Sequence, residues 1–586
     1  MIRTKIICTI GPAVNSYEQI KALASVGMNI ARLNFSHGTH EEHLKVIKII
    51  KEVRKELKIP LAIMLDTKGP EIRLRAINNG EVYLETGARW LLVRENIVGD
   101  AFRVAITPPS VLDEVKPDMR ILFDDGYISS RVVEIAADGV VVEIENGGVV
   151  RSGKGVNIPN ASLSLPAFTE KDVADIQFGC RNGIDLIAAS FVRSAEHVLA
   201  IRRLLEEEKC GDIQIIAKIE NSEGVQNFDS IIQVADGIMI ARGDLGVEVP
   251  LSHVPKLQKM MIRKCYLAGK PSVTATQMLE SMINNPRPTR AEVSDVANAI
   301  YDSTTAVMLS GETAVGKYPL KAVQVMRSVV MEAEQDFDYR NFFDFHAKLI
   351  YHDVPSALTL AAVKTAYSSN AKAIFAFTSS GTTARLLARL RPEIPIIAMT
   401  SNERCYNQMV LNWGVTPILE KECRSFSEAF NVVSSYALKE KIVSNGDLVI
   451  VTAGSPFGVS GTTNTMVVES IGDVLVRGES GVGERIHGKV SIVLSSEIKQ
   501  PYEVRGQLIL LAKCDPSYLP LINESAGIIL QNHIDDADSE KFALQVAKER
   551  KKTTIVRADG ALRTLKEGQL VTLDPEKALI YKGVVL

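Results

Sequence analysis

The sequence predicts an α/β fold built around a closed (β/α)8 barrel, with an inserted all-β lid, a C-terminal α/β domain and one further domain at the end. Apolar, β-branched runs recur at intervals of roughly 30–40 residues, and a polar turn and a helical pattern follow each run. Such runs are typical of parallel strands that are buried on both faces. Eight of them lie before residue 310, which favours a closed barrel over an open doubly wound sheet, the alternative.

One interruption separates the third run from the fourth. Between Thr67 and Phe168 the helical pattern gives way to short alternating segments such as RWLLV and GVVVEIE, separated by the turn signals NNG, DDG and NGG. Because loops after barrel strands build active sites, we interpret this all-β insertion as a mobile lid, with a decorative insertion as the alternative. The eight runs are Thr4–Ile10, Met28–Leu33, Leu61–Asp66, Asp185–Ser190, Ile213–Ile219, Gly237–Ala241, Pro271–Thr276 and Thr305–Leu309.

The 586 residues suggest roughly three to five domains, and the pattern favours four. After the barrel, three more parallel-strand runs occur at Ala373–Thr378, Ile394–Thr400 and Asp447–Gly454, and from about Ile471 the pattern becomes β-rich. The predicted domains are the barrel at 1–69 and 168–340, the lid at 70–167, an α/β regulatory domain at 341–471 and a C-terminal domain at 472–586.

Composition excludes several classes of protein. Lys plus Arg number 67 and Asp plus Glu 70, so the net charge of -3 argues against binding nucleic acid through bulk electrostatics. The 6% aromatic share leaves few stacking platforms for bases. No apolar run approaches the ~20 residues of a membrane span, and Gly11–Pro12 breaks the first apolar stretch, unlike a secretory signal. Seven scattered cysteines fit reduced thiols. We expect a cytoplasmic enzyme without nucleic-acid or membrane partners.

Polar side chains gather where the predicted strands end, which is where a barrel places its chemistry. Two carboxylates on neighbouring strand ends, Glu220 and Asp244, suit Mg²⁺ or Mn²⁺. Arg32, Arg73 and Lys218 supply positive charge for a phosphate or a developing enolate oxygen. Neutral oxygens with a single carboxylate suit a weakly held monovalent cation, and this set is Asn34, Ser36, Asp66 and Thr67.

Each of these residues also has an ordinary structural interpretation. The Lys218–Glu220 pair can be a salt bridge of the barrel mouth, and Asp244 a turn residue. Thr276, expected on one strand face with Thr274, can be a strand hydroxyl bonded to backbone, and Cys8 a small buried hydrophobe. Polar ends on at least six strands outweigh these alternatives and indicate metal-assisted phosphoryl or enolate chemistry.

The segments that carry these residues resemble those of pyruvate kinases, and they occur in the family's order. They cover most of residues 2–330, and a looser resemblance through TSSGTTARLLARLRP and GTTNTM reaches about residue 470. The resemblance implies transfer of the phosphoryl group of phosphoenolpyruvate to ADP, giving pyruvate and ATP in the final step of glycolysis. The segments are TIGPA, ARLNFSHG, LDTKGPEIR, KGVNIP, LPAFTEKD, AKIEN, ARGDLGVE, ATQMLESM and MLSGETA.

The resemblance assigns roles residue by residue. It implies that Glu220 and Asp244 bind Mg²⁺ or Mn²⁺, that Lys218 stabilises the transferring phosphoryl group and the enolate, and that Arg32 contacts the phosphate. Gly243 and Asp244 would hold the pyruvate end together with Thr276, which would lie on the route that protonates enolpyruvate, through its hydroxyl or a water that it orders. The K⁺ ligands by resemblance are Asn34, Ser36, Asp66 and Thr67, and the nucleotide contacts are Asn34, Phe35, Ser36, His37, Arg73 and Lys154.

Glu71 predicts the need for a monovalent cation, because potassium-dependent members of the family have Glu at this position and independent members have Lys. Two segments depart from the family pattern. Asp302–Thr305 reads DSTT where the family usually has DGTD, and EIRLRAINNG replaces the usual EIRTG near the lid hinge. Neither departure touches the residues assigned to metal or phosphate.

The loop Thr378–Thr383 follows a predicted strand and precedes a helix, a place where backbone N–H groups and hydroxyls bind anions. N-capping by Ser and Thr is the alternative. By resemblance the loop binds a phosphorylated allosteric effector, whether a sugar monophosphate, AMP or a bisphosphate, with Ser455 and Ser460–Thr463 closing it. The effector residues are Thr378, Ser379, Ser380, Gly381, Thr382 and Thr383.

The C-terminal domain resembles the swivelling phosphohistidine domain of phosphoenolpyruvate-utilising enzymes but lacks the family's T-S/C-H-A-A loop. His533 is the one histidine in the stretch Gln531–Glu540, and acidic residues follow it. We therefore expect a structural or interaction domain that carries no phosphate.

Two other functions remain as alternatives: a barrel that has lost catalysis and senses a metabolite, and a barrel lyase or aldolase that acts on enolpyruvate. We expect a homotetramer by resemblance.

Overall fold

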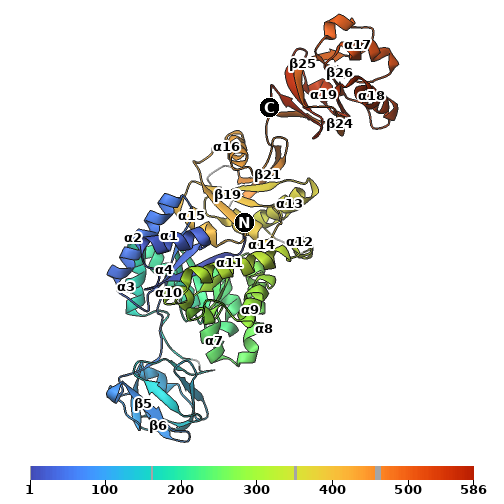
Figure 1. The fold of residues 1–586 in the computed structure, drawn as a ribbon. Helices are drawn as coiled ribbons and strands as arrows, with labels where there is room; N and C mark the ends of the chain where they lie inside the picture. The colour runs from blue at the N-terminus through green and yellow to red at the C-terminus, as the bar shows by residue number, and fades with distance from the viewer. Residues whose placement is uncertain (1, 160, 162, 349–352, 456–462, 586) are drawn as a thin grey trace. The chain divides into compact units, whose positions relative to one another are not determined.

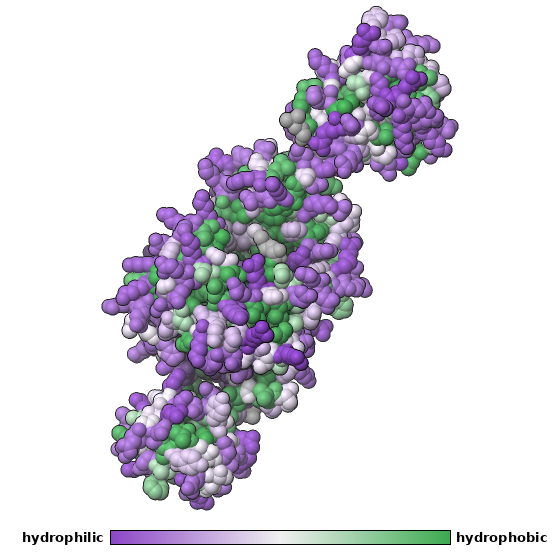
Figure 2. All heavy atoms as spheres, in the orientation of Figure 1, coloured by the Kyte–Doolittle hydropathy of each residue, from purple (hydrophilic) through white to green (hydrophobic). Residues whose placement is uncertain are grey.

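The computed structural model describes residues 2–159, 161, 163–348, 353–455 and 463–585. The chain forms two compact units. The first comprises Met1–Leu360, Ala376–Glu422 and Ala453–Asn464, and the second comprises Ala361–Phe375, Cys423–Thr452 and Thr465–Leu586. Figure 2 shows polar residues over most of the visible surface, with apolar residues scattered among them.

The predicted barrel is present, and its eight strands close in the order β1-β17-β16-β15-β14-β13-β3-β2. Figure 1 shows this part of the chain as a ribbon, with helices around it. All eight pairings between neighbouring strands of the barrel are parallel. The strands are nearly all buried, because apolar side chains fill the barrel interior on one face and pack under the helices on the other. They are β1 Lys5–Ile10, β2 Ile30–Asn34, β3 Ala62–Asp66, β13 Leu186–Ala189, β14 Gln214–Ile219, β15 Gly237–Ala241, β16 Ser272–Ala275 and β17 Ala306–Leu309.

Helices surround the strands, and four of them begin with a reciprocal capping box, at Ser16, Thr39, Thr169 and Thr289. Each box satisfies backbone N–H groups that the first helical turn leaves without partners. The helices are α1 Tyr17–Val26, α2 His40–Leu57, α3 Glu170–Arg181, α4 Ala195–Glu207, α5 Ser222–Gln226, α6 Phe228–Val234, α7 Arg242–Glu248, α8 Val254–Leu267, α9 Arg290–Tyr301, α10 Gly311–Ala314, α11 Pro319–Gln335 and α12 Tyr339–His346.

The insertion is all-β, as predicted, with a seven-stranded sheet and a two-stranded one. Its core is built around Trp90 and Phe123, whose rings meet edge to face at 5.3 Å. The larger sheet has the order β12-β8-β9-β10-β6-β7-β4 and the smaller pairs β11 with β5. The strands are β4 Arg73–Leu74, β5 Glu81–Leu84, β6 Arg89–Val93, β7 Arg103–Thr107, β8 Arg120–Phe123, β9 Ile128–Ile135, β10 Gly139–Ile144, β11 Gly148–Arg151 and β12 Val156–Asn157.

The α/β region that follows has a five-stranded sheet of order β20-β19-β18-β21-β22. The three predicted strand runs form β18, β19 and β21. The strands are β18 Ala373–Phe377, β19 Ile396–Thr400, β20 Val415–Leu419, β21 Leu448–Gly454 and β22 Thr463–Ser470, and the helices are α13 Val354–Ser368, α14 Thr382–Arg389, α15 Glu403–Gln408 and α16 Phe426–Lys439.

The C-terminal domain has an eight-stranded sheet of order β23-β30-β29-β25-β26-β27-β28-β24, but it is not only β-rich as expected. Its central strands β25 to β28 are parallel, so crossover connections join them, and α17 and α18 lie in two of these three connections. The strands are β23 Val474–Arg477, β24 Ser480–Val482, β25 Ile486–Val493, β26 Leu508–Leu511, β27 Gly527–Leu530, β28 Thr553–Val556, β29 Leu570–Asp574 and β30 Leu579–Lys582, and the helices are α17 Leu519–Glu524, α18 Ala537–Arg550 and α19 Ala561–Thr564.

The DSTT departure leaves the eighth βα unit in place. Ser303 has a φ of 73°, in the left-handed region that favours the glycine of the family pattern. Arg391 donates to the carbonyl oxygens of Ser303 and Thr304 at 2.5 and 2.7 Å. These bonds support the residues before β17, which pairs with both of its neighbours.

Candidate active site

A buried cluster of charged side chains occupies the carboxyl end of the barrel. Lys218, two residues after Ile216 on β14, projects on the same face as that core residue, toward the barrel axis. Its ammonium lies 3.1 Å from Asp66 Oδ1, 2.9 Å from Glu220 Oε1 and 2.7 Å from Ser190 Oγ. Two carboxylates therefore hold one ammonium at the top of the barrel.

Arg32 completes this cluster from β2. Its Nε donates to Asp66 Oδ2 at 2.6 Å and its Nη1 donates to Thr9 Oγ1 at 2.9 Å. Asp66 is 1% exposed and Arg32 is 9% exposed, so both charges are removed from water. Asp66 therefore fixes two cationic side chains side by side, because each of its oxygens bonds a different one.

The cluster sets the protonation states of its members. Burial raises the pKa of Asp66, but Arg32 and Lys218 outweigh burial and hold that pKa below its usual range. Burial lowers the pKa of Lys218, but Asp66 and Glu220 outweigh it and raise that pKa above its usual value. Lys218 is therefore a charged ammonium at neutral pH.

Asp244 lies in α7, directly after β15, close enough to Glu220 for their charges to interact. Burial, and then the charge of Glu220, raise the pKa of Asp244 to about 7. Such a pair of carboxylates repels until a cation comes between them. The donor set is hard oxygen, which is the chemistry that Mg²⁺ and Mn²⁺ prefer. Among the described residues, no group of three or more His, Cys, Asp and Glu side chains is placed to hold a metal. A divalent ion would therefore be coordinated by Glu220 and Asp244, with its other ligands supplied from outside this class of side chains.

Thr276 stands next to this pair in a strained conformation. Its φ is 61°, in the left-handed region that a β-branched residue rarely adopts. Its hydroxyl donates to the carbonyl of Ala275 at 2.7 Å and accepts from the backbone N–H of Gly243 at 2.8 Å. The expectation that Thr274 and Thr276 share a strand face is wrong, because β16 ends at Ala275 and Thr274 bonds Thr304 instead.

The residues assigned to a monovalent cation come from β2 and β3 and the turns after them. The backbone N–H of Ser36 donates to Asn34 Oδ1 at 3.1 Å, which turns the chain as β2 ends. Thr67 Oγ1 accepts from the N–H of Ser190 at 3.1 Å. Asn34 and Asp66 are paired in register across β2 and β3, so these oxygens lie at one edge of the mouth.

Lid and barrel residues together line a cavity of about 420 Å³. Arg73 and Lys154, both assigned to the nucleotide, line it with His37 and Asp244. Arg73 donates to Glu71 Oε2 at 2.5 Å, and Lys154 lies 2.8 Å from Asp124 Oδ1. The side chain of Phe35 lies elsewhere: it is 1% exposed and stacks on His43 at 4.0 Å, so it packs in the core rather than facing the cavity.

Sequence reasoning missed several residues of this site. Ser190 binds both Lys218 and Asp66, and its position at the end of the fourth predicted strand is the signal that was available. Asn157 of the lid donates to Glu248 of α7 at 2.8 Å, and Asp125 of the lid adds negative charge near Asp244. Glu312, which follows the end of β17, accepts backbone N–H groups of Leu279 and Ser310.

The predicted effector loop leads into α14. Gly381 has a φ of 80° and its N–H donates to Thr378 Oγ1 at 2.9 Å. Ser380 and Thr382 are joined through their hydroxyls at 3.1 Å, and Thr383 bonds Thr463 at 2.5 Å. Ser455 and Asn464 bond each other through two hydrogen bonds. Residues 460–462 of the second predicted loop lie outside the described residues.

His533 of the C-terminal domain is exposed and lies 3.3 Å from Asp535 Oδ2.

None of the helices among the described residues combines the length and the apolar character needed to cross a membrane.

Two family models match the chain. One described as pyruvate kinase, barrel domain, matches residues 1–323, and one described as pyruvate kinase, alpha/beta domain, matches residues 356–469. The C-terminal domain lies beyond both matches.

Curated relatives extend over the whole chain. The pyruvate kinase of Geobacillus stearothermophilus is 44% identical over 584 residues, which is 99% of this chain and 99% of the relative. That of Sporosarcina psychrophila is 42% identical over 586 residues, 100% of this chain and 99% of the relative, and that of Staphylococcus aureus strain USA300 is similar to the same extent. The C-terminal domain is thus shared with these relatives. The chain belongs to the pyruvate kinase family and is a phosphotransferase.

Proposed function

We propose that this enzyme transfers the phosphoryl group of phosphoenolpyruvate to ADP at the carboxyl end of its barrel, in the final step of glycolysis. One observation carries the assignment of the site. Lys218 is held charged between Asp66 and Glu220, beside the buried guanidinium of Arg32. Two fixed cations in a water-poor pocket are suited to the charge that spreads over a transferring phosphoryl group.

The roles of the protein groups follow from their positions. Arg32 binds the phosphate of phosphoenolpyruvate, and Lys218 stabilises the phosphoryl group in flight and the enolate oxygen left behind. Little covalent help is needed, so positioning and charge account for most of the acceleration. Thr276, with its hydroxyl bonded between Ala275 and Gly243, orders a water that protonates enolpyruvate.

The metals that the family uses fit the donors described above. Glu220 and Asp244 would hold Mg²⁺ or Mn²⁺, which when bound supplies positive charge to polarise the phosphoryl and enolate oxygens. The proposed K⁺ ligands are Asn34, Ser36, Asp66 and Thr67. The proposed nucleotide contacts are Asn34, Phe35, Ser36, His37, Arg73 and Lys154. Phe35 would contact the nucleotide through its backbone, because its side chain is buried.

A coupled assay tests this activity. Purified enzyme with phosphoenolpyruvate and ADP should form pyruvate when Mg²⁺ is present. Absence of pyruvate under these conditions would favour the two alternatives, a metabolite sensor without catalysis or a lyase. Pyruvate formed without ADP would point to the lyase.

Glu71 should make the enzyme dependent on K⁺. Its carboxylate bonds Arg73 and lies 4.0 Å from Lys68, so a lysine at position 71 would bring in the positive charge that a bound K⁺ provides. We expect the wild-type enzyme to lose most activity in buffer free of K⁺, Na⁺ and NH₄⁺, and Glu71→Lys to retain activity there. Glu85→Lys makes the same charge change at an exposed lid residue and should stay dependent. Full wild-type activity without K⁺ would contradict the prediction.

We also propose that the loop Thr378–Thr383 binds a phosphorylated effector, and that the enzyme is an allosteric homotetramer of the cytoplasm. Effector binding is supported by the turn at Gly381, which places hydroxyls and N–H groups at the start of α14.

Two exposed serines of this loop provide the test of effector binding. Ser379→Glu/Ser380→Glu introduces negative charge that should repel a phosphate. We expect activation by a sugar monophosphate or AMP, measured as a lower half-saturating phosphoenolpyruvate concentration, to be lost while turnover at saturation stays unchanged. Activation that survives in the variant would contradict the placement of the site.

A further inference from the structure

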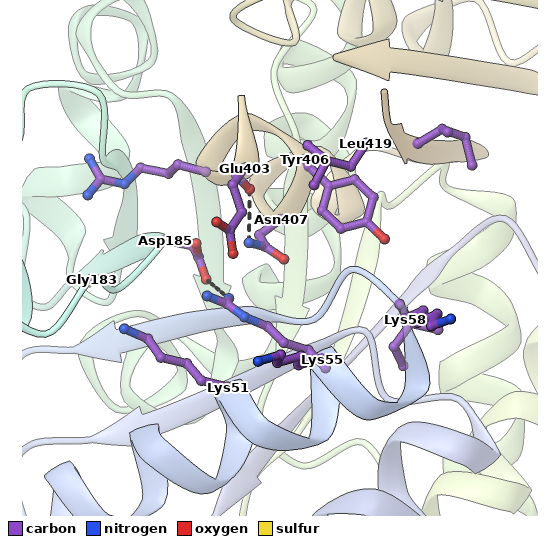
Figure 3. A pocket seen from close by; sticks show the side chains of 13 residues that line it. Lys51, Lys55, Lys58, Gly183, Asp185, Glu403, Tyr406, Asn407 and Leu419 are labelled. Carbon is purple, nitrogen blue, oxygen red and sulfur yellow. Dashed lines mark hydrogen bonds and ion pairs between the residues drawn. The ribbon is translucent and has the colours of Figure 1, made fainter. Parts of the chain in front are cut away.

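A second cavity, of about 770 Å³, lies between the barrel helix α2 and helix α15 (Figure 3). We call it the α2–α15 cavity. It is lined by the end of α2 and the two residues after it, the turn before β13, α15 and the end of β20. Its volume falls in the range of small-molecule sites, about 300–1,000 Å³. It shares no lining residue with the active-site cavity or the effector loop.

The lining is predominantly cationic. Five positively charged side chains face two carboxylates, and four of the five come from one face of α2 and the residue after it. Like charges at i, i+4 on a helix repel, so the pair Lys51–Lys55 costs stability unless an anion lies near it. The cations are Lys51, Arg54, Lys55, Lys58 and Arg404, and the carboxylates are Asp185 and Glu403.

Residues of the chain itself pair with only some of these cations. Arg54 lies 3.3 Å from Asp185, Arg404 pairs with Asp212, and Lys51 donates to a backbone carbonyl. Lys55 and Lys58, by contrast, form no ion pair with any residue in the described part of the chain. Figure 3 shows Lys55 near the end of α2 and Lys58 just beyond it, across the cavity from α15.

Asn407 gives a second, independent indication of a ligand. Its side chain is 2% exposed, and its Nδ2 donates to the carbonyl of Glu403 at 2.9 Å. Its Oδ1 is buried and has no hydrogen-bond partner among the described residues. A buried acceptor without a partner is destabilising, so we infer that a donor enters the cavity to bond this oxygen.

The remaining lining is apolar or aromatic. Ile59, Ile418 and Leu419 line the cavity together with the side chain of Tyr406, which lies beside Asn407 on α15 (Figure 3). Such a wall is suited to the face of a sugar or base ring, with polar groups fixing its orientation.

An ordinary explanation covers part of these features. Cations near the C-terminus of α2 interact favourably with the helix dipole, and exposed lysines are usually solvated. Arg404 is accounted for by its ion pair with Asp212, but neither explanation extends to the unpartnered oxygen of Asn407.

We propose that the α2–α15 cavity binds a phosphate ester whose other end carries hydroxyl or amino donors, as sugar phosphates and nucleoside monophosphates do. Lys55 and Lys58 bind the phosphate, Asn407 Oδ1 accepts a hydrogen bond from the ring substituents, and the ring lies against Leu419 and Ile59. A phosphate dianion alone offers no donor to Asn407, so the ester binds more tightly than inorganic phosphate.

Calorimetric titration of the full-length Ser379→Glu/Ser380→Glu enzyme, with ADP and Mg²⁺ saturating the active site, tests the proposal. The probes are glucose 6-phosphate, AMP and inorganic phosphate. We expect at least one ester to bind with a Kd of about 1 mM or below, and at least about fivefold more tightly than phosphate. Binding of AMP alone or of glucose 6-phosphate alone identifies which ester class the cavity takes.

Matched charge reversals on α2 distinguish the cavity from general electrostatics. Lys55→Glu/Lys58→Glu should weaken ester binding by about tenfold or more, whereas Lys45→Glu/Lys48→Glu, the same charge change at exposed residues of the same helix, should change it less than about threefold. Asn407→Ala, checked for folding by thermal unfolding, should reduce the preference for the ester over phosphate. The absence of ester binding, equal effects of the two double variants, or equal affinity for ester and phosphate would overturn the proposal.

Discussion

Lys218→Met should reduce the turnover of phosphoenolpyruvate and ADP by about 10³-fold or more, because it removes a fixed charge from the transferring phosphoryl group. The loss should fall mainly on kcat, since an interaction that strengthens in the transition state affects the rate more than ground-state binding. Steady-state kinetics at varied phosphoenolpyruvate, with pyruvate measured directly, give both parameters. Near-normal turnover would contradict the role of Lys218.

Loss of Lys218 also leaves Asp66 and Glu220 buried without one of their partners, so a fold effect must be separated from a catalytic one. Lys5→Met is the matched control. Lys5 is buried on β1 and donates to the carbonyl of Val415 at 2.9 Å. Burial lowers the pKa of Lys5 to about 8 against the smaller opposing effect of Glu334, whereas the pKa of Lys218 is raised. We expect Lys5→Met to retain turnover within about threefold even if its melting temperature falls.

Glu220→Gln should weaken divalent-metal binding by about tenfold or more, because a neutral amide replaces one of two carboxylates. Pyruvate formation should fall by about 10² or more at fixed Mg²⁺ and recover in part as Mg²⁺ is raised. Titration with Mn²⁺, with the free ion followed by its paramagnetic resonance signal, measures binding without turnover.

Glu334→Gln is the control for Glu220→Gln, because Glu334 is also a buried glutamate that accepts backbone N–H groups, those of Arg3 and Thr4. It should bind Mn²⁺ as the wild type does. Equal Mn²⁺ affinity in the wild type and in Glu220→Gln would mean that Glu220 is not a ligand and that the metal binds elsewhere.

Much of the barrel is predictable from the sequence because its strands are buried on both faces. The run Thr4–Ile10 forms β1 at Lys5–Ile10, and Gly237–Ala241 forms β15 without a change of bounds. Lys218 and Asp66 are likewise predictable as site residues from their positions at strand ends, because closing the barrel brings the carboxyl ends of all its strands to one rim.

Other parts depend on geometry that periodicity does not contain. Arg103–Thr107 pairs in parallel with β6 inside an otherwise antiparallel lid, a pairing that alternation alone does not indicate. Ser190 joins the active site only because its strand lies between β3 and β14. Helix α18 follows a short polar turn in a stretch interpreted as β-rich, and it has only a weak apolar face.

The most direct test of the account is the position of the divalent ion in a crystal grown with Mn²⁺ and oxalate, an analogue of enolpyruvate, and located by anomalous scattering. We expect one Mn²⁺ within about 2.0–2.3 Å of carboxylate oxygens of both Glu220 and Asp244, with oxalate beside Lys218. A Mn²⁺ bound without either carboxylate, or oxalate bound away from Lys218, would contradict the assignment of the barrel mouth as the active site.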